Sequence, residues 1–285
     1  MKSFLLIISF VFAAFFGNAQ VLSFDQKFYD ALDKWVVFEG TGNPKKHLIG
    51  FVYLDELSGI SFRHHATVLD KEEGLVLLDP ITDAIMASRL DSRTVDVAIL
   101  SDKQVQELKL PREPNWLSVY KVNEKTDKYQ VAKGRAYNAA GVSDLALPIL
   151  LKVYEKDPHL EGLEFELAYA YNHIGSFYKA VVVLNKAIEN DPDNFWFYRE
   201  LGFSFKHLNN LKEAERIYLK GIDLSNDNYQ KAEMAINMVQ SFFHVKDRKK
   251  FDEWVSILKK YADEDSQFLD YIPVFEERWD MQREK

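Results

Sequence analysis

Residues 161–194 read EGLEFELAYAYNHIGSFYKAVVVLNKAIENDPDN in this chain of 285 residues. Apolar residues such as Leu167 and Tyr171 recur at helical spacing before Gly175, and a second apolar stripe follows it. Glycine accepts the left-handed backbone conformation that ends a helix, so Gly175 marks a turn between two helices. Pro192 closes the segment because proline cannot continue a helix. The stretch therefore predicts a helix-turn-helix unit.

The same pattern returns when the chain is laid on itself at a constant offset that places Gly141 over Gly175 and Gly175 over Asn209. Small residues let the two helices of a unit approach closely, and an aromatic column fills the gap between them. A fixed register favours stacked repeats over a generic helical bundle, which has no reason to keep one. The columns in register are Ala146, Ala180 and Ala214; Gly134, Ala168 and Gly202; Tyr137, Tyr171 and Phe205; Gly141, Gly175 and Asn209; Leu150, Leu184 and Tyr218; and Pro158, Pro192 and Asn226.

This pattern resembles the tetratricopeptide-repeat family. Three units match, 127–160, 161–194 and 195–228. The resemblance implies an α-helical solenoid of about three to four helix-turn-helix units over residues 126–262. The middle unit matches the family at Leu167, Ala168, Tyr171, Gly175, Phe177, Ala180, Leu184, Ala187 and Pro192.

The register breaks from Tyr229 onward. Two further helices are expected over 232–243 and 248–262, and the second aligns with the repeat columns if three residues are inserted before it. A solenoid needs an atypical last unit because its outer face meets water. Residues 263–285 are amphipathic and are expected to form a capping helix that Pro273 kinks or starts, with a partner-binding tail as the alternative.

Residues 20–125 carry no such repeat and predict a small α+β module of unknown type. Because the helical repeats cover more of the chain, the predicted fold is mainly α overall. Ser23 and Gln26 have the spacing of a capping box, which predicts a helix over 24–37. After the glycine-rich turn at 40–44 the pattern alternates with period two. The expected strands cover 48–54, 60–68, 75–78 and 95–100, followed by a short helix capped at Ser101.

Residues 1–19 have the pattern of a secretory signal peptide. Lys2 precedes the apolar run Phe4–Phe16, and small residues end at Ala19. An uncleaved anchor is the alternative, but this run falls short of the roughly 20 residues that span a bilayer. No later stretch is as apolar, so we expect an exported, periplasmic or extracellular protein without membrane insertion after cleavage.

Composition and motifs exclude several classes of function. The net charge of −8 argues against nucleic-acid binding, and the absence of cysteine excludes disulfides and thiol chemistry. No phosphate-binding glycine loop, serine elbow or metalloprotease helix occurs. His47, His64 and His65 lie close in sequence, but neighbouring strand residues point to opposite faces, so a hydrogen-bonded core role for His64 is favoured over a metal site. No enzyme activity, cofactor or metal is predicted.

On the first helix of each unit, one stripe of residues packs against the other helices and a second stripe lies beside it. The second stripe is a better candidate site than the histidines. In tetratricopeptide-repeat proteins this stripe lines the concave groove, and the resemblance implies the same here. Its charged members are all basic, which favours an extended, carboxylate-bearing peptide or protein as the partner. The groove residues predicted in this way are Lys128, Arg135, Asn138, Phe165, Tyr169, Asn172, His173, Trp196, Arg199, Phe203, Lys206 and His207.

The sequence thus predicts an exported interaction module or scaffold that binds a protein or peptide in its groove. In the alternative, the front α+β module has a small-ligand or enzymatic function and the repeats dock it. Self-association through the solenoid edge or the tail, near Phe275 and Trp279, is a third possibility.

Overall fold

The computed structural model describes residues 22–71, 74–78, 80–81 and 85–281. The chain divides into two compact units, one of residues 1–52, 62–87 and 95–114, the other of 53–61, 88–94 and 115–285. The domain boundaries expected at residues 125 and 262 stay a prediction. The expected signal peptide at 1–19 lies outside the described residues.

The strands of the described residues form one six-stranded sheet in the order β4-β3-β2-β1-β6, with β5 paired to β3. Strand β2 is covered on both faces, since Ile49, Phe51 and Val52 are fully buried and Tyr53 and Leu54 nearly so. The elements of this part are the 3-10 helix η1 (Phe28–Ala31), β1 (Lys34–Thr41), β2 (Lys46–Asp55), β3 (Gly59–Lys71), β4 (Gly74–Leu78), β5 (Ala87–Arg89), β6 (Val97–Ile99), α1 (Asp102–Glu107) and η2 (Asn115–Val119).

The helix predicted over 24–37 is wrong. Only the short η1 forms, and β1 starts at Lys34. Ser23 caps nothing, because its hydroxyl donates to Asp25, while the backbone of Gln26 pairs with Val97. Burial on a central strand outweighs the local helical pattern here.

The capping box predicted at Ser101 is confirmed. The Gln104 backbone N–H donates to Ser101 Oγ at 3.3 Å, and the Ser101 N–H donates to Gln104 Oε1 at 2.9 Å. The two bonds satisfy groups at the start of α1 that the helix itself leaves unpaired.

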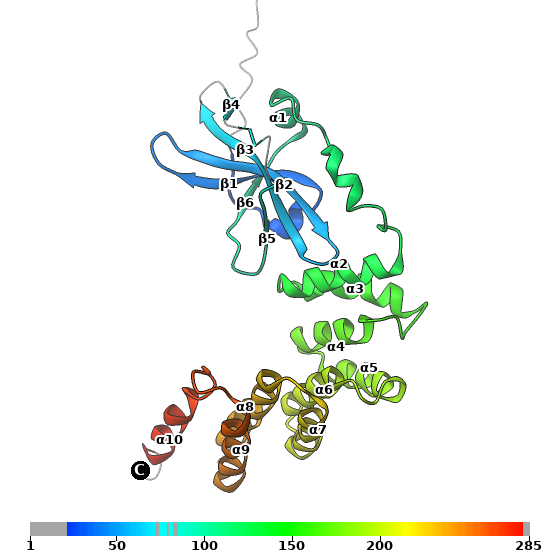
Figure 1. Cartoon of the computed structure of the whole chain (residues 1–285), viewed down its shortest axis with the longest axis vertical. Coiled ribbons are helices and arrows are strands. Elements are labelled where there is room, and N and C mark those ends of the chain that lie inside the picture. The colour runs from blue at the N-terminus through cyan, green and yellow to red at the C-terminus, as the bar shows by residue number, and fades with distance from the viewer. Residues whose placement is uncertain (1–21, 72–73, 79, 82–84, 282–285) are drawn as a thin grey trace, which may run out of the picture. The chain divides into compact units, whose positions relative to one another are not determined.

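The second half of the chain is a series of helix pairs, as predicted from the repeat (Figure 1). Each helix contacts the next, and first helices also contact each other, as in α2 with α4, α4 with α6 and α6 with α8. The pairs are α2 (Asp127–Ala139) with α3 (Ser143–Tyr154), α4 (Leu163–His173) with α5 (Phe177–Asn190), α6 (Phe195–His207) with α7 (Leu211–Leu224), and α8 (Asn228–His244) with α9 (Arg248–Tyr261).

The turns within the pairs have the left-handed conformation that the sequence predicts. Gly141, Gly175 and Asn209 have φ of 78°, 75° and 58°. Lys246 takes the same role in the fourth pair with φ of 60°, and it lies three positions beyond the place that the repeat register gives after Asn209. This difference agrees with the three inserted residues expected in the last unit.

The small-residue column serves close helix approach. A Cβ on Gly134 would lie 2.4 Å from Leu150 Cδ2, and one on Gly202 would lie 2.5 Å from the Tyr218 ring. No side chain fits at either position without moving the helices apart.

Helix α10 (Tyr271–Met281) covers the end of the fourth pair. Phe275 and Trp279 are buried in one cluster with Phe243 and Phe251, and the ring centroids of Phe243 and Phe275 are 4.7 Å apart. Pro273 stands in the first turn, where its missing N–H costs no helical hydrogen bond. The arrangement is that of a capping helix.

We expect Trp279→Ala to lower the free energy of unfolding by about 3 kcal/mol, because it empties a site between α8, α9 and α10. Tyr271→Ala is the matched control, since Tyr271 is 48% exposed on the same helix and should cost much less. Urea unfolding followed by circular dichroism measures both. Equal losses would mean that α10 is not a packed cap.

Candidate functional site

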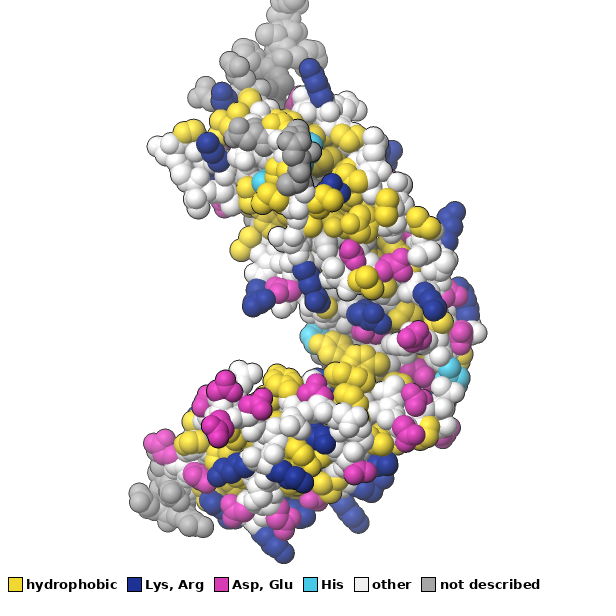
Figure 2. All heavy atoms as spheres, in the orientation of Figure 1, with side chains coloured by type: hydrophobic (Ala, Val, Ile, Leu, Met, Phe, Trp, Pro, Cys, Tyr) yellow, Lys and Arg dark blue, Asp and Glu magenta, His cyan; other side chains and the backbone are white. Residues whose placement is uncertain are grey.

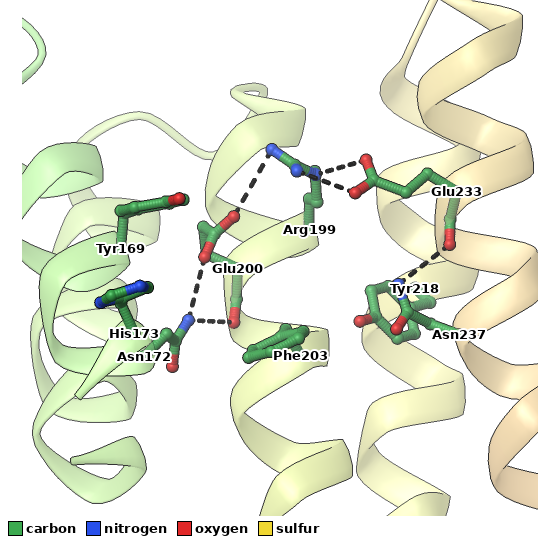
Figure 3. Close-up of a pocket in the computed structure, with 9 residues that line it drawn as sticks. All are labelled: Tyr169, Asn172, His173, Arg199, Glu200, Phe203, Tyr218, Glu233 and Asn237. Atoms are coloured by element: carbon green, nitrogen blue, oxygen red, sulfur yellow. Dashed lines mark hydrogen bonds and ion pairs between the residues drawn. The ribbon is translucent and has the colours of Figure 1, made fainter. Parts of the chain in front are cut away.

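Two pockets lie along the helix pairs, and both contain residues of the predicted stripe. Hydrophobic side chains gather over α4 in the space-filling view (Figure 2). The Tyr218 pocket, of about 270 Å³, is lined by Tyr169, Asn172, His173, Arg199, Glu200, Phe203, Tyr218, Glu233 and Asn237 (Figure 3). The Trp196 pocket, of about 300 Å³, is lined by Arg135, Gly162, Phe165, Glu166, Asn194, Trp196 and Phe197.

The structure brings eight of the twelve predicted groove residues into these two pockets and leaves four outside. Lys128 is exposed in the first turn of α2, and Asn138 is buried between α2 and α4. Lys206 and His207 lie on the last turn of α6, where the His207 ring stacks on Phe177 at 4.8 Å between centroids. Whether any of these residues binds a peptide stays a prediction.

Aromatic rings form a continuous row along α4 and onto α6. Phe165, Tyr169 and His173 follow one another at intervals of four residues, with centroids 6.3 Å apart at each step. Trp196 meets Phe165 edge to face at 5.6 Å. Because Trp196 is still 36% exposed, this row offers apolar area to a partner.

Two buried glutamates that the sequence analysis did not select join neighbouring repeats. Asn138 Nδ2 donates to the Glu166 backbone oxygen and to Glu166 Oε2, both at 2.9 Å. One repeat later, Asn172 Nδ2 donates to the Glu200 backbone oxygen at 3.1 Å and to Glu200 Oε2 at 3.0 Å. Because the same contact occurs in two successive repeats, Asn138 and Asn172 are structural links rather than free groove donors.

The arginines of the stripe are paired with these glutamates and with Glu233. Arg135 Nε lies 2.9 Å from Glu166 Oε1. Arg199 holds Glu233 with two bonds, from Nε at 2.9 Å and Nη2 at 3.0 Å, and its Nη1 lies 3.5 Å from Glu200 Oε1. Two of the four cations of the stripe are therefore paired with acids, and these acids stand outside the stripe positions.

Burial sets the protonation tendencies of the Tyr218 pocket and of Lys206 beside it. It raises the pKa of Glu200, against the opposing effect of Arg199 and the hydrogen bond from Asn172. It lowers the pKa of Lys206. Burial, followed by the nearby carboxylates of Glu200 and Glu233, raises the pKa of Tyr218 well above its ordinary value, so this phenol stays protonated.

One sequence signal could have revealed this network. Glu166 and Glu200 occupy the same position of successive repeats, as Asn138 and Asn172 do, and both glutamates sit next to buried positions of the repeat. A polar residue that recurs within a buried register needs a partner. That partner lies one repeat away and cannot be seen within one unit.

The histidines of the front module are accounted for by local contacts. His64 Nε2 donates to the Ala66 backbone oxygen at 2.8 Å, and His47 Nδ1 accepts from the Gly40 N–H at 3.1 Å. The His65 ring meets Trp35 at 5.2 Å. Among the described residues, no three acidic, histidine or cysteine side chains are grouped so as to hold a metal.

Two family models, each described as tetratricopeptide repeat, match residues 165–194 and 183–216. A comparison with curated proteins gives no match. Within the described residues, the helices are too short or too polar to cross a membrane.

Several solved structures are similar to part of the chain. TTC0263, a thermophilic TPR protein in Thermus thermophilus, is 15% identical, with 54% of this chain and 84% of that chain covered and a TM-score of 0.47. A MamA structure from MSR-1 is 21% identical, with 51% and 84% covered and a TM-score of 0.40. One from AMB-1 is 25% identical, with 44% and 68% covered and a TM-score of 0.34.

All three TM-scores are below 0.5. The two family matches agree with the repeated helix pairs and their left-handed turns. The helical part of this chain is therefore a solenoid of tetratricopeptide repeats.

Proposed function

We propose that this protein, an interaction scaffold by virtue of its repeats, binds an extended peptide along the groove formed by α4, α6 and α8. The observation that carries the proposal is the pair of neighbouring pockets on these helices, connected by the ring contacts of Phe165 with Tyr169 and Trp196. Aromatic anchors in adjacent pockets are typical of protein interfaces.

The ion pairs of the groove bear on the charge of the partner. The sequence predicts an acidic peptide because the charged members of the stripe are basic. Arg135 and Arg199, however, are held in ion pairs at 2.9 Å, and an incoming carboxylate would have to compete with Glu166 or Glu233 for them. We propose that apolar contact with the aromatic row contributes most of the binding energy, and that acidity of the peptide is secondary.

We also propose that the protein is exported, on the pattern of residues 1–19 alone. Expression of the full chain with a C-terminal tag, followed by fractionation and intact mass measurement, tests this. Loss of the mass of residues 1–19 in the exported fraction is expected. A full-length product retained in the cytoplasm would contradict the proposal.

Peptide selection tests the groove. Peptides that bind the full chain are selected from a random display library, and their affinities are then measured for Trp196→Ala and for Tyr178→Ala. Trp196 lines a pocket, whereas Tyr178 is 76% exposed on α5 and lines neither pocket. We expect Trp196→Ala to weaken binding tenfold or more, as loss of an aromatic anchor does, and Tyr178→Ala to leave it within twofold.

Circular dichroism checks that both variants keep the helical content of the wild type. Equal affinities of both variants would place binding elsewhere on the molecule. A selection that yields no binding peptide would remove the proposed function itself.

A further inference from the structure

The Tyr218 hydroxyl is a buried polar group with unused hydrogen-bonding capacity. Tyr218 is 1% exposed, and among the described residues its oxygen has no hydrogen-bond partner. Its side chain lines the pocket together with Phe203 of α6 and Asn237 of α8 (Figure 3). Buried hydroxyls are nearly always hydrogen-bonded in folded proteins, so this exception points to a group that enters from outside.

The neighbouring amides are already engaged and do not fill this role. Asn172 donates to Glu200 and accepts from the Ser204 hydroxyl at 2.7 Å. Asn237 Nδ2 donates to the Glu233 backbone oxygen at 3.0 Å, and its Oδ1 accepts from Lys206 Nζ at 2.6 Å.

The charges around the pocket balance. Among the lining residues, Glu200 and Glu233 contribute two negative charges and Arg199 one positive charge. Lys206 lies outside the lining, but its ammonium reaches the lining residue Asn237 at 2.6 Å and brings the second positive charge. An additional charged side chain would be taken out of water into a site with no net charge to meet it, which is costly. The balance therefore disfavours both an acidic and a basic side chain.

The walls of the pocket set the remaining requirements. Tyr169, His173 and Phe203 present ring surfaces to the stem of the entering group. A volume of about 270 Å³ lies just below the roughly 300–1,000 Å³ typical of small-molecule sites, which suits one side chain better than a cofactor.

From these observations we infer that the Tyr218 pocket accepts an uncharged amide side chain, glutamine or asparagine, of the bound peptide, with the amide hydrogen-bonded to the Tyr218 hydroxyl. A primary amide both donates and accepts, as the hydroxyl does, and its apolar stem lies against the rings. The inference rests on the proposed peptide-binding function and adds the class of residue that the groove selects.

Blocked octapeptide pools test the inference with the full chain. The peptides are N-acetylated and C-terminally amidated, one position in turn is fixed as Gln, norleucine, Glu or Lys, and the other positions are random uncharged residues. Norleucine keeps a linear apolar side chain but carries no amide. We expect one position at which the Gln pool binds about tenfold tighter than the norleucine pool, the value of one well-placed hydrogen bond, and at least tenfold tighter than the Glu and Lys pools.

Tyr218→Phe removes only the hydroxyl oxygen and should keep the melting temperature of the wild type, since that oxygen has no partner to lose among the described residues. In this variant the Gln preference should fall to within twofold. Tyr178→Phe is the matched control, because it deletes the same atom from an exposed tyrosine on α5, and it should keep the full preference.

The failures of the two proposals are distinguishable. Pools that bind but favour Glu or Lys, or a Gln preference that survives in Tyr218→Phe, would overturn the amide assignment and leave the groove in place. Binding by none of the pools would overturn the groove and the amide assignment together.

Discussion

Replacing Asn172 by leucine should lower the free energy of unfolding by about 3 kcal/mol, the cost of removing hydrogen bonds from a buried, charged residue. Glu200 is 5% exposed, and Asn172 supplies hydrogen bonds to both its backbone oxygen and its Oε2. Leucine has nearly the same size but no donor. Glu200 would keep its ion pair with Arg199, at 3.5 Å between Nη1 and Oε1, but its Oε2 would lose the bond from Asn172.

A double-mutant cycle separates this link from the loss of packing. Glu200→Met alone removes the charge, and the pair Asn172→Leu with Glu200→Met should recover a large part of the lost stability, because neither partner is then left unsatisfied. Additive losses in chemical denaturation would show that the two residues act independently.

Lys206 provides a control at the same repeat position. It stands one repeat after Asn172, but its ammonium donates to Asn237 instead of a buried glutamate, and burial lowers its pKa. Lys206→Leu should therefore cost far less than Asn172→Leu. The comparison isolates the asparagine–glutamate link from the general effect of placing leucine at that position.

The repeat could be predicted from the sequence because its rules act over short distances. A left-handed turn at Gly175 favours glycine, and a close helix approach at Gly202 requires a small residue, whatever the rest of the chain does. The three residues inserted before the second helix of the fourth pair could be predicted for the same reason. Lys246 takes the turn position that this insertion implies.

The front module shows where such local rules fail. The sequences Ser23–Gln26 and Ser101–Gln104 have the same spacing of a capping box, yet only the second starts a helix. The first lies beside the sheet, because the Gln26 backbone pairs with Val97, a residue more than seventy positions away. No local pattern marks a partner at that distance, so the order of the strands could not be predicted either.

The candidate site lies between these two cases. Its aromatic residues follow from the helical period, and Phe165, Tyr169 and Trp196 line the two pockets. Its charge balance does not follow, because Arg135 meets Glu166 and Arg199 meets Glu233 across repeat boundaries. The stripe of a single helix contains the arginines, but the glutamates that pair with them belong to the next repeat.

The second large effect is expected at Trp254, in the last helix pair. Trp254 is 1% exposed in the cluster of α8, α9 and α10, and its Nε1 donates to Glu215 Oε1 of α7 at 3.1 Å. The Trp254 side chain thus packs in the core of the fourth helix pair and is hydrogen-bonded to the third pair.

We expect Trp254→Ala to lower the free energy of unfolding by about 4 kcal/mol, since it leaves a large cavity and removes a donor from Glu215. Trp254→Phe is the matched control, because it keeps most of the apolar volume and loses only the donor, and its cost should be about 1 kcal/mol. Because each repeat is stabilised mainly by its neighbours, the loss should open α8–α10 before the rest of the solenoid. Hydrogen exchange read by mass spectrometry should then show faster exchange over residues 228–281, with residues 163–190 unchanged. Uniform acceleration along all the helices would contradict this local opening and would mean that the solenoid unfolds as one unit.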